Sequence, residues 1–303
     1  MIKPLCITVM KSYLKALIQA GRAWVSDNVF KHSAAVSFYT LFSLAPVTII
    51  ALAMAGFFFG KEAAAGQFNS QMSQLVGKEG AKAIQDSVAA SQLHPSGGWA
   101  TALGIVLLIV GATTVFAQLQ DSLNDIWGVV AKPSRSGLVV MLMHRLLSFA
   151  MVLTVGFMLL VSLILTTALT ALVHLAGMEA TSLIVRGADF LSALVLVTVL
   201  FAMLFKVMPD VELKWADVWR GAFVTSLLFG LGRFGIALYL GHSTVASAYG
   251  AAGSLVALLV WIYYSSAILF FGAEFIKAYS TRGKRKVIPK ETAVRVTRTI
   301  AQS

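Results

Sequence analysis

Residues 250–278 read GAAGSLVALLVWIYYSSAILFFGAEFIKA and contain no charged side chain before Glu274. A helix needs about 20 mainly apolar residues to cross a bilayer, so this stretch is long enough to span one. The whole chain shares this character, since 58% of its 303 residues are hydrophobic and 12% are charged, against about 25% charged in soluble domains. The composition therefore predicts an all-α, polytopic membrane protein. It speaks against a porin-like barrel, whose strands are short and alternating.

Five more apolar stretches precede this one and bring the predicted number of spans to six. They are residues 34–60, 99–120, 144–175, 186–208 and 217–241. Pro46 lies inside the first span and predicts a kink, because proline removes a backbone hydrogen-bond donor. We expect the spans to form one transmembrane domain over residues 34–280, with a helical loop at 61–98.

Residues 1–33 precede the first span and show the periodicity of an amphipathic helix, with a basic face opposite an apolar one. The apolar face consists of Tyr13, Leu14, Leu17, Ile18, Trp24 and Val25. Such a helix lies in the membrane interface or docks on the helix bundle, and the pattern favours neither arrangement. We expect no cleaved signal peptide, because the first long apolar run begins only near Ala34, behind five basic residues.

The distribution of Lys and Arg predicts the orientation of the chain. Of these 24 residues, 19 lie on the side that holds both termini, four lie on the other side, and Arg233 lies inside a span. By the positive-inside rule, both termini are cytoplasmic, including the basic tail at 281–303. In a membrane protein, the net charge of +11 indicates topology and contact with anionic lipid rather than nucleic acid.

Residues suited to enzyme chemistry are few and scattered. The single cysteine, Cys6, excludes an intrachain disulfide and a multi-cysteine metal site. The five histidines include no pair at the i, i+4 spacing of a helical metal motif, and the chain has no Walker motif. We therefore expect no enzyme activity, no metal site and no cofactor, and we expect any transport to run downhill or on a gradient.

Polar side chains inside the spans are the candidates for function, because a charge in hydrocarbon costs several kcal/mol unless it is paired or hydrated. Arg233, in the glycine-rich fifth span, either binds a lipid phosphate or an anionic substrate from a cavity, or is satisfied structurally by Asp189 or by helix carbonyls. Glu274 pairs with Arg145 or Lys277, or lines an inner cavity. The hydroxyls in the middle of the sixth span line a pathway or bond neighbouring helices. The candidate pathway residues are Arg233, Asp189, Tyr263, Tyr264, Ser266 and Glu274.

Other residues are assigned structural roles. We expect Asn124 and Asp125 to cap the end of the second span, and Trp127 to lie in the aromatic belt at the membrane surface. Small residues four apart, such as Gly253 and Ala257, favour close helix packing. The full set with structural roles is Pro46, Asn124, Asp125, Trp127, Gly250, Gly253 and Gly272.

Three motifs resemble the YihY / virulence factor BrkB family. They are SAAVSFYTLFSLAP at 33–46, LNDIWG at 123–128, and YGAAGSLVALLVWIYYSS at 249–266 with FGAE at 271–274. The resemblance implies a six-helix bundle in a bacterial inner membrane, with the loop at 61–98 in the periplasm. It implies no catalytic residues. Members of the family have carried the label ribonuclease BN and have been linked to serum resistance and to envelope lipid or lipopolysaccharide traffic.

These observations make a transporter or translocator of a lipid, or of another amphipathic anionic envelope component, the leading hypothesis. The alternative is a non-transporting scaffold or regulator of the envelope, which binds protein partners through residues 61–98 or the basic tail. A membrane ribonuclease comes third, because the scattered histidines offer no cluster of metal ligands. The expected partners are membrane lipids and an anionic lipid or lipopolysaccharide-type substrate, without nucleic acid. The sequence leaves the oligomeric state open.

Overall fold

The computed structural model describes residues 3–60, 65–66, 81–82, 84–86, 98–132, 183–242, 253–282 and 286–296. This part of the chain is largely helical, as the sequence predicts. The predicted third span at 144–175, Gly250 and most of the predicted loop at 61–98 lie outside the described residues. The count of six spans therefore stays a prediction.

The helices coincide with the predicted segments. They are α1 (Lys3–Ser26), α2 (Val29–Phe59), α4 (Gly98–Trp127), α6 (Leu183–Val207), α7 (Trp215–His242) and α9 (Gly253–Ser280). Within the described residues, three stretches are long and apolar enough to cross a membrane: Val29–Ile50, Phe190–Val207 and Leu255–Ser280. These stretches belong to α2, α6 and α9, which correspond to the first, fourth and sixth predicted spans. Helices α4 and α7 lie where the second and fifth spans are predicted.

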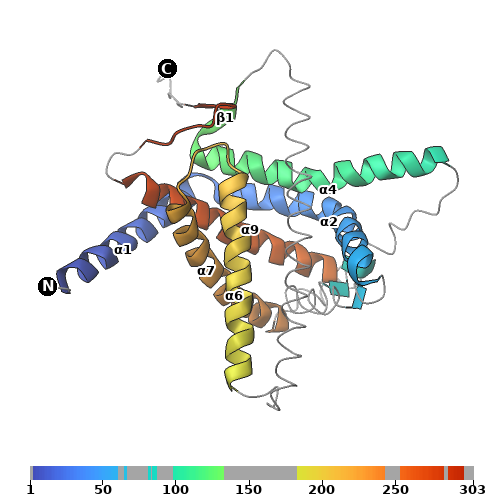
Figure 1. The fold of residues 1–303 in the computed structure, drawn as a ribbon, viewed down its shortest axis with the longest axis horizontal. Coiled ribbons are helices and arrows are strands. Elements are labelled where there is room, and N and C mark those ends of the chain that lie inside the picture. Colours follow the sequence, from blue (N-terminus) through green and yellow to red (C-terminus); the bar gives the residue numbers. More distant parts are fainter. Residues whose placement is uncertain are drawn as a thin grey trace.

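Helix α9 occupies the centre of the bundle (Figure 1). It packs against α1, α2 and α7, while α4 packs on α2 and α6 packs on α7. The largest apolar core includes Leu123, Phe205 and Phe270, which come from α4, α6 and α9. Helix α7 can approach α9 closely because residue 221 is a glycine. A Cβ at Gly221 would collide with the side chain of Ile276.

Pro46 lies inside α2, and the helix continues on both sides of it. The ring of Pro46 packs directly against α4, where a Cβ at Gly111 would lie 2.9 Å from Cγ of the proline. One turn earlier, Ser43 donates a hydrogen bond from Oγ to the carbonyl of Gly111. Gly111 therefore leaves the space that the proline ring fills.

Helix α1 docks on α9 with only two of the six residues of its predicted apolar face, Tyr13 and Trp24, together with two alanines. Ala16 and Ala20 are fully buried, the ring of Tyr13 stacks on Phe275, and Trp24 donates a hydrogen bond from Nε1 to the carbonyl of Ala267. The other four residues of the face stay exposed: Leu14, Leu17, Ile18 and Val25. The helix thus shows one of the two arrangements that the sequence left open, docking on the bundle. Its location in a membrane interface stays a prediction, to which the exposed apolar stripe is suited.

A small antiparallel sheet departs from the all-α prediction. Strand β1 (Val129–Ala131) follows α4 directly and pairs with β2 (Ala293–Arg295), which comes from the tail. Gly128 connects α4 to β1 with a φ of 65°, a conformation that favours glycine. We call this part of the bundle, where β1 and β2 lie, the sheet end (Figure 1). The tail segment 286–296, which the sequence describes only as basic, is part of the folded structure.

Candidate functional site

A shallow pocket lies between α7 and α9. The two helices come into contact here because residue 232 is a glycine. A Cβ at Gly232 would collide with the ring of Tyr264 and would lie 2.8 Å from Cδ1 of Ile268. The lining residues are Phe229, Gly232, Arg233, Ile236, Trp261, Tyr264 and Ser265. The structure therefore brings together two of the predicted candidates, Arg233 and Tyr264.

Arg233 lies on an exposed and otherwise apolar face of α7. Its neighbours Leu231 and Phe234 are 70% and 62% exposed, and its guanidinium carbon lies 5.9 Å from the centre of the Phe234 ring. Within the described part of the chain, no carboxylate lies within salt-bridge distance of Arg233. The side chain of Asp189 lies outside that part, so the predicted pair with Arg233 stays a prediction. An arginine placed in this way is accessible to an anion that approaches from outside the bundle.

The size of the pocket limits what it can hold. Sites that enclose a small molecule measure roughly 300–1,000 Å³, whereas this pocket is a shallow contact between two helices and cannot enclose a whole lipid. An anionic group such as a phosphate would therefore contact Arg233, which is exposed, from the open side of the pocket. Arg233 offers that group a planar fork of N–H donors, and the hydroxyls of Tyr264 and Ser265 lie in the same lining.

The polar side chains in the middle of α9 do not share one direction. Tyr264 and Ser265 line the pocket, whereas Ser266 is buried and Tyr263 is partly buried outside the lining. The sequence analysis did not find Phe229 and Trp261 as lining residues. Helical spacing could have indicated them, since each lies three or four residues from a predicted candidate and so on the same helix face.

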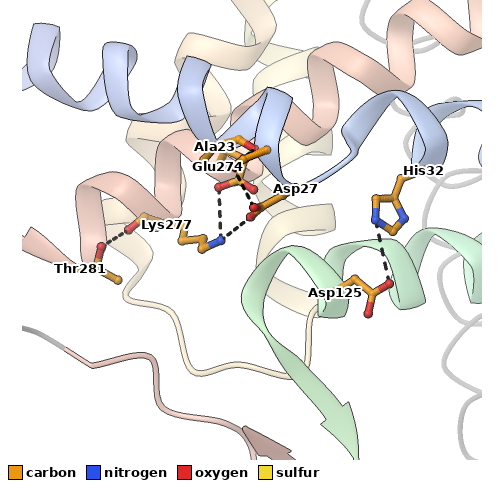
Figure 2. Close-up of polar contacts among 8 residues, drawn as sticks. Ala23, Asp27, His32, Asp125, Glu274, Lys277 and Thr281 are labelled. Carbon is orange, nitrogen blue, oxygen red and sulfur yellow. Dashed lines mark hydrogen bonds and ion pairs between the residues drawn. The ribbon is translucent and has the colours of Figure 1, made fainter. Parts of the chain in front are cut away.

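Glu274 belongs to a second polar group, at the junction of α9 with the turn between α1 and α2 (Figure 2). Nζ of Lys277 lies 2.8 Å from Oδ2 of Asp27 and 3.5 Å from Oε2 of Glu274. The pair with Lys277 is one of the two that the sequence predicts for Glu274, and the other candidate, Arg145, lies outside the described residues. Asp27 was not predicted. It is held in the turn by its backbone N–H, which donates to the carbonyl of Ala23, and it precedes Asn28, whose φ is 54°.

The environment of Asp27 favours its ionised form. Partial burial is the largest single influence and acts to raise the pKa of Asp27, but the hydrogen bonds to its carboxylate and the positive charge of Lys277 together outweigh burial and hold the pKa below its ordinary value of 3.8. Asp27 and Lys277 are therefore an ion pair at neutral pH. The pair ties the α1–α2 turn to the C-terminal part of α9.

A third polar group lies at the sheet end and is centred on Asp210, between α6 and α7. Asn124 donates from Nδ2 to Oδ2 of Asp210 at 2.8 Å, and its Oδ1 accepts from the backbone N–H of Asp210 at 2.8 Å. Gln120 also donates to the Asp210 carboxylate. The carbonyl of Asp210 accepts from the backbone N–H of Lys290, so the tail is attached to the same residue. Burial lowers the pKa of the Lys290 ammonium, and the negative charge of Asp210 opposes this effect.

This network corrects the structural roles predicted for the LNDIWG motif. Asn124 is not a cap at the end of α4, because both of its side-chain groups bond Asp210. Asp125 is exposed and lies 3.9 Å from Nε2 of His32. Trp127 does not belong to an aromatic belt, because it is 4% exposed within the main apolar core. Asn124 and Asp125 contact residues that are distant in the sequence, and Trp127 packs in a core that several helices build.

The remaining predicted residues serve helix packing. Gly253 begins α9 and is buried, and a Cβ at Gly272 would collide with Thr225 and lie 2.9 Å from Cζ of Phe205. Among the described residues, no group of three His, Cys, Asp or Glu side chains is placed to hold a metal ion.

The long apolar helices and their packing define the class of the molecule as a helical membrane protein. The chain belongs to the Virulence factor BrkB family, because the sequence pattern of that family matches residues 20–295. This match confirms the family that the three motifs indicate.

Relatives of known sequence carry the same general description. A UPF0761 membrane protein of Stenotrophomonas maltophilia (strain K279a) is 25% identical over 256 residues, which cover 82% of this chain and 57% of that protein. Another, from Rhodospirillum centenum, is 27% identical over 257 residues, which cover 84% of this chain and 54% of its own. The chain thus spans little more than half the length of these relatives. No solved structure matches the chain.

Proposed function

We propose that this protein is a non-enzymatic translocator of an anionic, amphipathic lipid in the bacterial inner membrane. The observation that carries the proposal is the position of Arg233, exposed on an apolar face of α7 beside the pocket between α7 and α9. Six spans with both termini in the cytoplasm are part of the proposal. Membership of a membrane-protein family and three apolar helices of sufficient length support the membrane setting.

The surroundings of Arg233 favour a lipid over a soluble anion. A charge that faces hydrocarbon costs several kcal/mol unless a partner or water reaches it. The phosphate of a lipid meets this need from within the bilayer, and a guanidinium binds phosphate through two parallel hydrogen bonds. The apolar chains of the same molecule can lie along Leu231 and Phe234, which are exposed on either side of Arg233.

The small pocket favours a path in which the lipid is not enclosed. The phosphate meets Arg233 at the open side of the pocket, so the acyl chains stay in the bilayer while the headgroup moves. The pocket depends on the close approach of α7 and α9 at Gly232. Translocation then requires protein groups that lower the cost of carrying a phosphate past apolar surroundings, and Arg233 supplies the charge.

The experiment measures the movement of NBD-labelled phosphatidylglycerol in reconstituted vesicles, with dithionite quenching as the readout. We expect wild-type protein to accelerate movement between the leaflets. Arg233→Lys keeps the charge and loses the planar fork, so we expect the rate to fall roughly tenfold, in line with the loss of one charged hydrogen bond. The matched control is Arg220→Lys on the same helix, because Arg220 pairs with Asp217 away from the pocket. This control should keep the wild-type rate.

A double variant separates transport from a structural role of Arg233. If Arg233 and Asp189 form only a structural pair, Arg233→Met combined with Asp189→Leu restores a folded protein with full activity, because neither charge is left unpaired. The proposal predicts a folded double variant that does not move the lipid. Full transport by this variant would exclude Arg233 from the pathway, and absence of transport by the wild type would favour a membrane scaffold.

A further inference from the structure

The group formed by Asp27, Glu274 and Lys277 combines two carboxyl groups with one ammonium. Nζ of Lys277 is closer to Asp27, at 2.8 Å, than to Glu274, at 3.5 Å. Glu274 is 1% exposed, and within the described residues neither of its carboxylate oxygens accepts a hydrogen bond. Figure 2 shows the two carboxyl groups converging on Lys277 from the α1–α2 turn and from α9.

The charges of this group balance only when Glu274 carries a proton. Lys277 neutralises Asp27, which already accepts a short hydrogen bond from it. An ionised Glu274 would add a second negative charge beside Asp27, in a buried position where its one ion-pair partner among the described residues is Lys277, at the longer distance of 3.5 Å. Burial and a like charge both favour the neutral form of a carboxyl group. Two close carboxyl groups therefore divide into one that is ionised and one that is protonated.

We propose that Glu274 is a reversible proton-binding site, and that loss of its proton weakens the docking of α1 and the α1–α2 turn on α9. The proton comes from the aqueous side through Asp27 and Lys277, whose side chains are 34% and 28% exposed and cover the buried Glu274. The inference is independent of the substrate and does not rest on the lipid pathway at Arg233. Tyr264, in the pocket lining, lies ten residues before Glu274, about 15 Å along α9.

Other charged groups near this junction are directed elsewhere. On α2, His32 faces Asp125 of α4 at 3.9 Å, and Figure 2 shows this pair apart from Glu274. On α7, Arg220 pairs with Asp217, and its guanidinium lies 5.2 Å from the centre of the Tyr279 ring. The guanidinium carbon of Arg282, which follows α9, lies 5.0 Å from the centre of the same ring. Ion pairs at this junction thus join Lys277 of α9 to Asp27 of the α1–α2 turn and to Glu274 of α9.

A proton fits this site better than a metal cation does. The ammonium of Lys277 lies within 4 Å of both carboxyl groups and would repel a second cation there. A sodium or calcium ion also needs several oxygen ligands. The described residues place no group of three acidic or histidine side chains together.

The first measurement is the infrared carbonyl band of a protonated carboxyl group, recorded on purified full-length protein as the pH is raised. We expect a band that disappears at high pH in the wild type and that is missing at every pH in Glu274→Gln. Asp125→Asn, which removes an exposed carboxyl group on α4, is the matched control and should leave the band unchanged. A wild type without the band at any pH would refute the proposal, whatever the variants do.

The second measurement follows the docking of α1. Spin labels at Leu14→Cys and Phe223→Cys, both exposed, report the distance between α1 and α7 in a Cys6→Ser background. As the pH rises, we expect the undocked fraction to increase about tenfold in the wild type, because one unpaired negative charge is created beside Asp27. Glu274→Gln mimics the protonated form and should stay docked throughout.

Two other results would contradict the assignment to a proton on Glu274. An equal pH response in Glu274→Gln would assign the titration to another group. A change in docking when sodium replaces potassium at constant pH would assign a metal-cation site instead. Neither measurement uses a lipid probe, so failure here and failure of the lipid pathway are distinguishable.

Discussion

Single residues decide how closely α7 approaches α9, and two nearby glycines show the contrast. A Cβ at Gly232 would collide with the ring of Tyr264, whereas a Cβ at Gly230 would meet nothing within 4 Å. Both glycines lie inside the helix, where glycine is less favourable than alanine by roughly 1 kcal/mol. Gly232 therefore serves packing and shapes the pocket, while Gly230 does not contact α9.

We predict opposite effects for alanine at these two positions. Gly232→Ala should lower the free energy of unfolding by roughly 1–3 kcal/mol, because Tyr264 and Ile268 must shift to admit the methyl group. Gly230→Ala should leave it unchanged or raise it by up to about 1 kcal/mol through helix propensity. Thermal unfolding in the same detergent checks both variants. Equal changes in the two melting temperatures would show that packing on α9 does not depend on Gly232.

The sequence indicated the residues whose roles follow from their own chemistry and helix position. The sequence indicated Arg233 and Glu274 because a charge inside an apolar span needs a partner or a ligand. In the structure, Arg233 lines the pocket and Glu274 pairs with Lys277. Asp27 and Asp210 were missed because nothing in their local sequence marks their partners. Asp27 meets Lys277 from 250 positions away, and Asp210 meets Asn124 from 86 positions away.

At the scale of elements, the sheet end is held by contacts among α4, the α6–α7 connection and the tail. Asn124 makes two hydrogen bonds to Asp210, and the carbonyl of Asp210 accepts from the backbone N–H of Lys290. Strand β2 follows in the same tail segment and pairs with β1. Removing Asn124 should therefore loosen the tail as well as the end of α4.

We predict that Asn124→Leu exposes the tail to protease and destabilises the sheet end. The buried Asp210 carboxylate and its N–H would lose their bonds to Asn124, which costs about 1–3 kcal/mol for each unsatisfied group. The measurement is the rate of tryptic cleavage after Lys290, which should increase relative to the wild type. Asp125→Asn is the control, because Asp125 is exposed and it is the adjacent Asn124 that bonds Asp210. If both variants were cleaved at the wild-type rate, the network would not hold the tail.

The helices were predictable from sequence, but the sheet was not. Long apolar runs specify α2, α6 and α9 by length and composition alone, since a bilayer helix satisfies all of its backbone groups internally. Strands β1 and β2 have three residues each, too few for a period-two pattern to be recognised. Their pairing depends on Gly128 and on the tail returning to α4, neither of which a local pattern reveals.

At the scale of the whole molecule, basic residues gather where the sheet end and the C-terminal end of α9 lie. Lys206 and Lys290 contact carbonyl groups of the sheet end, and Lys277 binds Asp27 at the α1–α2 turn. Nineteen Lys and Arg residues fall on this predicted side, against four on the other. Such an asymmetry governs the orientation of helical membrane proteins during insertion. We therefore expect the sheet end to face the cytoplasm.

Cysteine labelling tests this orientation in a Cys6→Ser background. Glu291→Cys places an exposed thiol in the tail at the sheet end, and Lys82→Cys places one in the predicted periplasmic loop. In intact spheroplasts, a membrane-impermeant maleimide should label position 82 and not position 291. A chain with six spans has both termini on one side of the bilayer, and the loop after its first span lies on the other side. After lysis, both positions should react, which shows that the thiol at 291 is accessible. Labelling of position 291 from outside would reverse the orientation and place Asp27, Glu274 and Lys277 on the periplasmic side.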